Sequence, residues 1–301
     1  MWITDSHWST LSTASLAVCV VLLGGAAHAQ QQACSVTSVL AILPAPLIFN
    51  VQQEQALGDV EAQWVEANYP VVQDDALASH LNTVAGRVLA QFPPDQARVR
   101  VILIDVPEAG SFSAGPERIY ITRKMVTMLN NDDELAGLLG HEMGHIVTHQ
   151  NAIIVTELLH ELLGVNSVTD RKDISDKLLR MLTSIDTDKK AFQKAAQVIQ
   201  RREDIHQCDA DRVALQTAAA AGYSPQAYLN LFERSAKTNA NTGSLLADSF
   251  VATASDRKRL HEIRKTLKRL PQPCREIVPA PSSEFLTWQA GVLSYPDLAR
   301  R

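Results

Sequence analysis

The feature that most constrains the fold of this chain is the stretch LLGHEMGHIVTHQ, from Leu138 to Gln150. Its apolar residues recur at the spacing of one helix face. Upstream, Asn131 and Glu134 are typical of a capping box, with an Asx side chain at the cap and a glutamate three residues later. The pattern therefore predicts a largely buried helix that begins near Asn131 and ends at about Gln150.

Three histidines follow one another at intervals of four residues in this stretch. Residues four apart share one face of a helix, so His141 and His145 can direct two imidazoles at one metal ion. Glu142 lies about 100° around the helix, where it can reach a water molecule beside the metal without binding the metal. His149 lies about 12 Å from His141 along the axis and is expected to form a hydrogen bond just beyond the site. The alternative is a pair of core histidines with hydrogen-bonding partners and no metal.

A hydrolytic zinc site also needs a third protein ligand and one open coordination position. The segment RREDIHQCDADRVALQTAAAAGYSP, from Arg201 to Pro225, brings several kinds of ligand together on one expected helix. We therefore look for the third ligand in this segment.

The rest of the chain indicates helices followed by a small sheet. Helical spacing is present from Gln52 to Asn68 and again after Asp74, and the Val- and Ile-rich stretches Arg98–Asp105 and Arg118–Thr122 are typical of strands. A Gly-, Ser- and Pro-rich loop separates the two strands. We expect an α+β fold, mostly helical, with the small sheet beside the helix of His141.

The composition argues against a nucleic-acid-binding protein. The 301 residues are 46% hydrophobic and 20% charged, with a formal net charge of −5. The densest basic stretch, from Arg257 to Arg269, is diluted by Glu262 and is typical of the solvated face of a helix. The length suits one sizeable domain or two small ones.

The N-terminal segment has the pattern of an export signal. Leu16 to Ala27 is apolar but too short to span a bilayer, and Ala27-His28-Ala29 provides a small-x-small cleavage pattern. Asp5 stands where Lys or Arg is usual, so an uncleaved anchor is the alternative. We expect a periplasmic or secreted protein with a signal peptide (1–29), an N-terminal lead (30–55), one domain (56–270) and an irregular C-terminal tail (271–301).

Cleavage would remove Cys19 and leave three cysteines, Cys34, Cys208 and Cys274. An odd number permits at most one disulfide bond. A Cys34–Cys274 bond would join the two ends of the mature chain and leave Cys208 as a buried free thiol, although spacing alone does not fix this pairing.

Three segments of the chain occur in a characteristic order: GSFSAGPERIYITRKMVTMLNNDDELAGLLGHEMGHIVTHQ, then CDADRVALQTAAAAGYSP, then ASDRKRLHEI. This ordered set resembles the HtpX/CAAX-prenyl-endopeptidase family of gluzincin zinc metallopeptidases, specifically its exported, soluble bacterial members. The resemblance extends from Val60 to Leu267. It implies a zincin-like metallopeptidase domain with one Zn²⁺ per chain.

Residue by residue, the resemblance implies that His141 and His145 are metal ligands and that Glu142 is the general base. It also implies that Asp211 orients a ligand histidine, since imidazoles bound to a metal usually donate their other N–H group to an acceptor.

The third ligand departs from the family pattern. The family places a glutamate four residues before the aspartate, and this chain has Gln207 there. A neutral amide oxygen is a weaker zinc ligand than a carboxylate. We rank Gln207 first, Glu203, one turn earlier on the same face, second, and the adjacent His206 third.

The resemblance implies an exported zinc-dependent endopeptidase that hydrolyses polypeptide substrates in envelope protein quality control. The substrate is expected to pair with the strand Arg118–Thr122, with the loop Gly110–Pro116 as one wall. Tyr223 is either a donor to the oxyanion or a packed tyrosine at a helix exit. A peripheral contact with the membrane or an envelope protein is compatible with this function. Gln207 motivates the alternative of a protein with the same fold but weakened or lost catalysis, acting as a binding or chaperone-like module.

Overall fold

The computed structural model describes residues 34, 47–94, 96, 98–238, 256–279 and 282–296. The expected signal peptide (1–29) lies outside these residues. Among the described helices, none is long and apolar enough to cross a membrane. The strands are β1 (Arg100–Ile104), β2 (Ser111–Ala114) and β3 (Arg118–Thr122). The helices are α2 (Val51–Asn68), α3 (Asp75–Leu89), α4 (Arg123–Val126), α5 (Asp132–Val147), α6 (Gln150–Leu163), α7 (Arg171–Thr187), α8 (Lys189–Ala220), α9 (Pro225–Thr238), α11 (Asp256–Arg269), α12 (Gln272–Arg275) and α13 (Ser283–Ser294).

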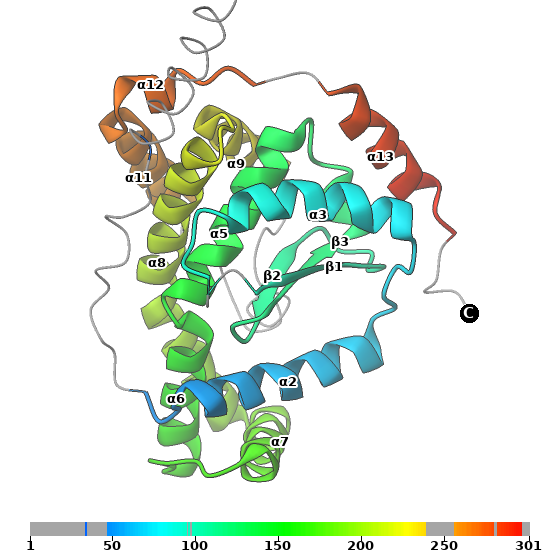
Figure 1. The fold of residues 1–301 in the computed structure, drawn as a ribbon. Coiled ribbons are helices and arrows are strands. Elements are labelled where there is room, and N and C mark those ends of the chain that lie inside the picture. Colours follow the sequence, from blue (N-terminus) through cyan, green and yellow to red (C-terminus); the bar gives the residue numbers. More distant parts are fainter. Residues whose placement is uncertain are drawn as a thin grey trace, which may run out of the picture.

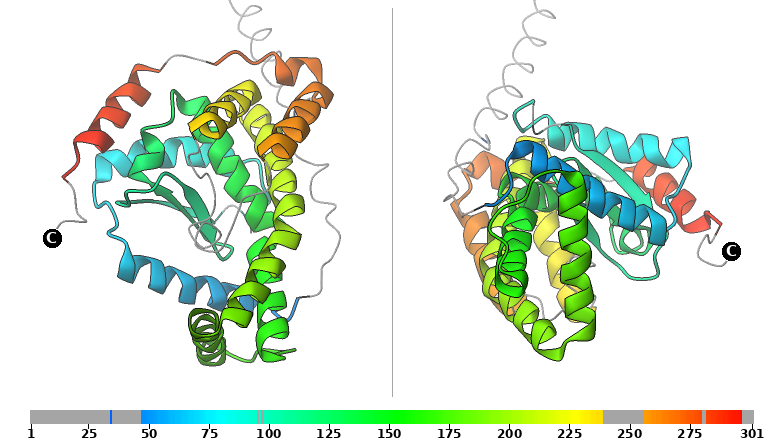
Figure 2. Two further views of the ribbon diagram at one scale, coloured as in Figure 1. Left: turned by 180° about the vertical axis from the view of Figure 1, so that it is seen from behind. Right: turned by 90° about the horizontal axis from the view of Figure 1, so that it is seen from below.

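The expected α+β fold is confirmed: helices surround one small sheet. In Figure 1, α5 runs beside the sheet, α2 and α3 lie on its two sides, and α8 follows α5. Figure 2 shows from behind that α8 and α5 form one long pair. The sheet therefore has α5, the helix of the histidine motif, as its neighbour.

The order of the strands is β1-β3-β2, which corrects the expected substrate-binding edge. β3 lies in the middle, parallel to β1 and antiparallel to β2, so its backbone is paired on both sides. The edge beside α5 is β2, which lies inside the segment that its Gly, Ser and Pro content marked as a loop. The strand forms because Ser111 to Ala114 fold back on β3 around Gly115, which has a φ of 57°.

Helix α5 begins where the capping box places it and ends before Gln150. The Asn131 side chain accepts a hydrogen bond from the Glu134 N–H group, and every residue of α5 except Asp132 and His145 is buried. His149 then adopts the left-handed conformation, with a φ of 53°, and α6 starts at Gln150. This break separates two helices that apolar spacing alone does not distinguish.

Helices α5 and α8 approach each other through small residues. A Cβ atom added at Gly144 would lie 2.6 Å from the Cα atom of Ala210, and one added at Gly140 would lie 3.0 Å from that of Ala214. Both glycines therefore allow backbone contact that a larger residue would prevent. The two contacts also define an antiparallel register between α5 and α8.

The C-terminal tail is not irregular as expected from its prolines. Ser282 caps α13, and Phe285, Trp288 and Val292 are buried against the main core. The Trp288 Nε1–H group donates to the Leu77 carbonyl at 2.9 Å. The apolar residues of this segment recur at helical spacing between two prolines. That spacing indicated a helix, although the proline content of the tail suggested irregular structure.

The expected disulfide bond between Cys34 and Cys274 is confirmed, and Cys208 is a free, partly buried thiol. The bond ties the N-terminal lead to α12. The leucines of α6 and α7 mostly belong to a second core with α2 and α8, although Leu179 and Leu182 remain exposed.

The glycine contacts predict opposite effects of two alanine substitutions in helices. Gly144→Ala should lower the free energy of unfolding by about 1–3 kcal/mol, because α5 must move away from α8. Gly86→Ala in α3 is the matched control: nothing lies within 4 Å of the added methyl group. It should raise the free energy of unfolding by about 0.5–1 kcal/mol. Urea unfolding measures both, and equal effects would contradict the close contact.

Candidate functional site

The two motif histidines turn toward one point. Their Nε2 atoms lie 3.0 Å apart and their rings meet at an interplanar angle of 89°. Both rings project from α5 one turn apart, as residues four apart on a helix do. The arrangement leaves the Nδ1 atom of each ring for a protein partner.

A buried chain of polar groups holds His141. Its Nδ1 atom lies 3.0 Å from both the Tyr228 hydroxyl and the Asp211 Oδ1 atom. The Tyr228 hydroxyl donates to the same Asp211 oxygen at 2.7 Å. Arg259 donates to both carboxylate oxygens, from Nε at 2.9 Å and Nη2 at 2.6 Å. The guanidinium group also stacks on the Phe232 ring, 4.4 Å from its centroid.

The charge on Asp211 depends on Arg259. Burial alone would raise the pKa of the Asp211 carboxyl group, but the charge and hydrogen bonds of Arg259, together with His141, hold it well below its usual range. Asp211 is therefore ionised at neutral pH and accepts a hydrogen bond from the His141 ring.

His145 is held by a different partner. Its Nδ1 atom contacts the Gln150 side-chain oxygen, and the Gln150 amide donates to the His206 carbonyl at 2.8 Å. Burial and the neighbouring His141 hold the pKa of His145 well below its usual range. A neutral imidazole has a lone pair available on its second nitrogen.

Glu142 lies beside the histidine pair on the side of the sheet. The Ser111 hydroxyl of β2 donates to its Oε1 atom at 2.6 Å. Its Oε2 atom is buried and has no hydrogen-bonding partner among the described residues. Burial raises the pKa of Glu142, opposed by His141 and by the Ser111 hydrogen bond. A carboxylate with one anchored and one open oxygen is suited to taking up a proton.

The donor set fits a divalent metal ion. Two nitrogens bound to one zinc ion at about 2.0–2.1 Å in tetrahedral geometry lie about 3.3 Å apart, close to the separation of the Nε2 atoms. The Nδ1 atoms already have acceptors, which is the usual arrangement behind histidine ligands. Among the described side chains, which do not include that of Glu203, no third histidine, cysteine or carboxylate joins the pair. Gln207 and His206, the first and third candidates for the third ligand, are both buried on the neighbouring helix α8.

The structure adds residues that the sequence did not single out. Tyr228, Ser111 and Gln150 contact His141, Glu142 and His145 respectively. Arg259 could have been suspected, because it is one of the two arginines of the ASDRKRLHEI segment. For the other three, no spacing relates the residue to the motif.

Two other sequence expectations have clear outcomes. The His149 Nδ1 atom lies 2.9 Å from the Glu54 carboxylate of α2, so it forms a hydrogen bond away from the histidine pair, as expected. The Tyr223 hydroxyl accepts a hydrogen bond from Arg87 at 3.3 Å and its ring belongs to the main core. Tyr228, not Tyr223, is the tyrosine at the histidine pair.

The buried ion pair predicts a strong dependence of stability on Arg259. Arg259→Met should lower the free energy of unfolding by about 3–5 kcal/mol, because Asp211 is left as a buried carboxylate without its counter-charge. Arg264→Met is the control on the same helix, since its pair with Glu233 is exposed and worth about 0–1 kcal/mol. Urea unfolding at pH 7 distinguishes the two, and similar small losses would contradict the assignment of Arg259.

The comparisons with known proteins agree with this geometry. The model of peptidase family M48 matches residues 72–267. A curated relative, the beta-barrel assembly-enhancing protease of Yersinia pestis, is 22% identical over 185 residues, which cover 62% of this chain and 38% of the relative. The chain thus aligns with well under half of that protein's length. Because the family model covers most of the chain, from α3 to α11, the protein belongs to peptidase family M48, a family of metallopeptidases.

Proposed function

We propose that this peptidase is a zinc-dependent endopeptidase, with His141, His145 and Gln207 as metal ligands and Glu142 as general base. The convergence of the two Nε2 atoms beside a buried carboxylate carries the proposal. The proposal takes one ion per chain, held by this pair.

The register of α5 on α8 favours Gln207 over Glu203 as the third ligand. The contacts of Gly140 with Ala214 and of Gly144 with Ala210 place residue 209 level with His145. Gln207 is two residues from that level, about 3 Å along the axis, and Glu203 is six residues away, about 9 Å. By the same register, residue 213 is level with His141. Asp211, which contacts His141, is also two residues from that level. Gln207 therefore has the same position along α8 relative to His145 as Asp211 has relative to His141.

When bound, a zinc ion supplies a positive charge that polarises a carbonyl group and lowers the pKa of water toward about 7. Glu142 accepts a proton at its open Oε2 atom and delivers it to the leaving amine. Ser111 keeps the other oxygen fixed, so the carboxylate does not rotate away. Asp211, Tyr228 and Gln150 keep the imidazoles in place during the reaction.

The polypeptide substrate lies along β2 in this proposal. The Thr122 N–H group donates to the Gly110 carbonyl, and pairing alternates along the antiparallel ladder. The backbone groups of Ser111 and Ser113 therefore turn away from β3. An extended peptide can pair with them next to Glu142, as strands add to exposed sheet edges. Gly115, packed on Gly58 of α2, limits this edge at its far end.

We also propose that the protein is exported and acts on proteins of the bacterial envelope. The apolar N-terminal stretch and the confirmed disulfide bond support an oxidising compartment. The similar protein from Yersinia pestis is named for enhancing beta-barrel assembly, which is compatible with such substrates. A second candidate function, binding without efficient hydrolysis, is favoured by the amide at Gln207.

The role of Glu142 predicts a specific loss of hydrolysis. Glu142→Gln should reduce casein digestion in the presence of zinc by about 10²–10⁴-fold, because the proton acceptor is lost. The variant should bind as much zinc as the wild type when zinc is supplied, since Glu142 is not a ligand in this proposal. Glu157→Gln on α6 is the control for the same change of charge. Equal digestion by the wild type and Glu142→Gln would reject Glu142 as the general base, and absent digestion by the wild type with zinc supplied would favour the binding function.

The identity of the third ligand predicts an order of zinc affinities. Gln207→Ala should lose more zinc on dialysis against a chelator than Glu203→Ala, because Gln207 is nearer to His145. Gln207→Glu should bind zinc on the order of tenfold more tightly, since it provides a carboxylate ligand. A larger loss from Glu203→Ala, measured by metal analysis, would reverse the assignment.

A further inference from the structure

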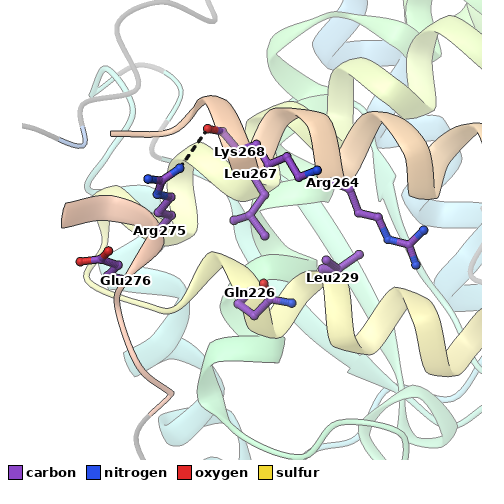
Figure 3. A pocket seen from close by; sticks show the side chains of 7 residues that line it. All are labelled: Gln226, Leu229, Arg264, Leu267, Lys268, Arg275 and Glu276. Carbon is purple, nitrogen blue, oxygen red and sulfur yellow. Dashed lines mark hydrogen bonds between the residues drawn. The ribbon is translucent and has the colours of Figure 1, made fainter. Parts of the chain in front are cut away.

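A surface hollow of about 450 Å³ lies between α9, α11 and α12, away from the histidine pair. Figure 3 shows Leu267 of α11 directed toward α9, where Leu229 lies, with Arg275 on one side and the side chains of Lys268 and Arg264 on the other. Its volume lies within the range of ligand pockets, about 300–1,000 Å³. The hollow thus combines an apolar floor with a cationic rim.

The charges of the rim leave an excess of about one positive unit. Arg264 is paired with Glu233 at 2.7 Å, outside the lining. Lys268 and Arg275 have no ion-pair partner among the described residues, and the Arg275 Nη1 atom donates only to the Lys268 carbonyl at 3.3 Å. Glu276 is the one carboxylate of the lining. Lys268 and Arg275 against Glu276 suit a singly charged anion better than a doubly charged phosphate.

The two helices that form the hollow also support the histidine pair. In helix α9, Tyr228 contacts His141, and the next residue, Leu229, lines the hollow. Helix α11 carries Arg259 to Asp211 and, about two turns later, Leu267 to the hollow. A ligand of the hollow therefore binds the same two helices that contribute Tyr228 and Arg259 to the candidate site.

We propose that this hollow binds the free C-terminal carboxylate of a polypeptide that ends in an apolar residue. The carboxylate forms ion pairs with Lys268 and Arg275, and the apolar side chain packs on Leu229 and Leu267. The inference rests on the proposed function in one respect, because it takes the ligand to be a peptide substrate or a product of hydrolysis. The carboxylate supplies the single negative charge that the rim requires, and the floor selects the apolar side chain.

Calorimetric titration of the full chain with short peptides tests this proposal. The probe is an acetylated tetrapeptide of three alanines and a C-terminal leucine, and Glu142→Gln in all samples prevents hydrolysis. We expect the peptide with a free carboxylate to bind about tenfold or more tightly than its C-terminal amide. The double variant Lys268→Glu/Arg275→Glu should abolish this difference. Lys190→Glu, an equally exposed cation of α8, should leave it unchanged.

Three results would overturn the inference. Equal binding of acid and amide would remove the role of the carboxylate, and an equal loss in Lys190→Glu would indicate general charge attraction. Equal binding of a peptide that ends in serine, with displacement by inorganic phosphate, would indicate an unselective anion site. Casein digestion by the wild-type chain tests the proposed function separately. If the wild type does not digest casein but the peptide still binds through its carboxylate, the proposed peptidase activity is rejected and the proposed binding site is retained.

Discussion

The backbone contact between α5 and α8 determines the geometry of the candidate site. Gly140 and Gly144 bring α8 so close that Asp211 reaches His141 from the opposite helix. A wider spacing would separate the imidazole from its carboxylate, and the two halves of the site would not meet. The same contact sets which residues of α8 are level with His145. The small residues between the two helices therefore contribute to the chemistry without touching a substrate.

The second constraint is the burial of charge. Asp211, Arg259 and Glu142 are all nearly inaccessible to water; Asp211 and Arg259 form an ion pair, whereas Glu142 has no cationic ion-pair partner among the described residues. An ionised carboxylate in such surroundings is costly unless it is paired. Arg259 therefore keeps Asp211 ionised, whereas burial raises the pKa of Glu142. Two carboxylates on neighbouring helices thus have pKa values shifted in opposite directions.

The sequence predicted those parts of the structure that depend on local pattern. The cap at Asn131 and the shared face of His141 and His145 follow from spacing along one helix, and the fold class follows from the helical and strand patterns in the rest of the chain. The edge strand β2 was missed because Ser111 to Ala114 have weak strand propensity and pair only through tertiary contact with β3. Tyr228 and Gln150 were missed for a related reason. Their roles depend on how helices pack, and no periodicity within one segment records that packing.

The amide at Gln207 changes the charge of the proposed site more than its shape. With the family's glutamate, a divalent ion, Glu142, Asp211 and Arg259 would sum to zero; with Gln207 they sum to one positive unit. The ion is then held less firmly, since one anionic ligand is absent, but its field on a substrate carbonyl is less neutralised. In the proposed site, weak retention of the ion and effective polarisation of the carbonyl would therefore go together. Low zinc content after purification would be consistent with an active peptidase, and activity has to be judged with zinc supplied.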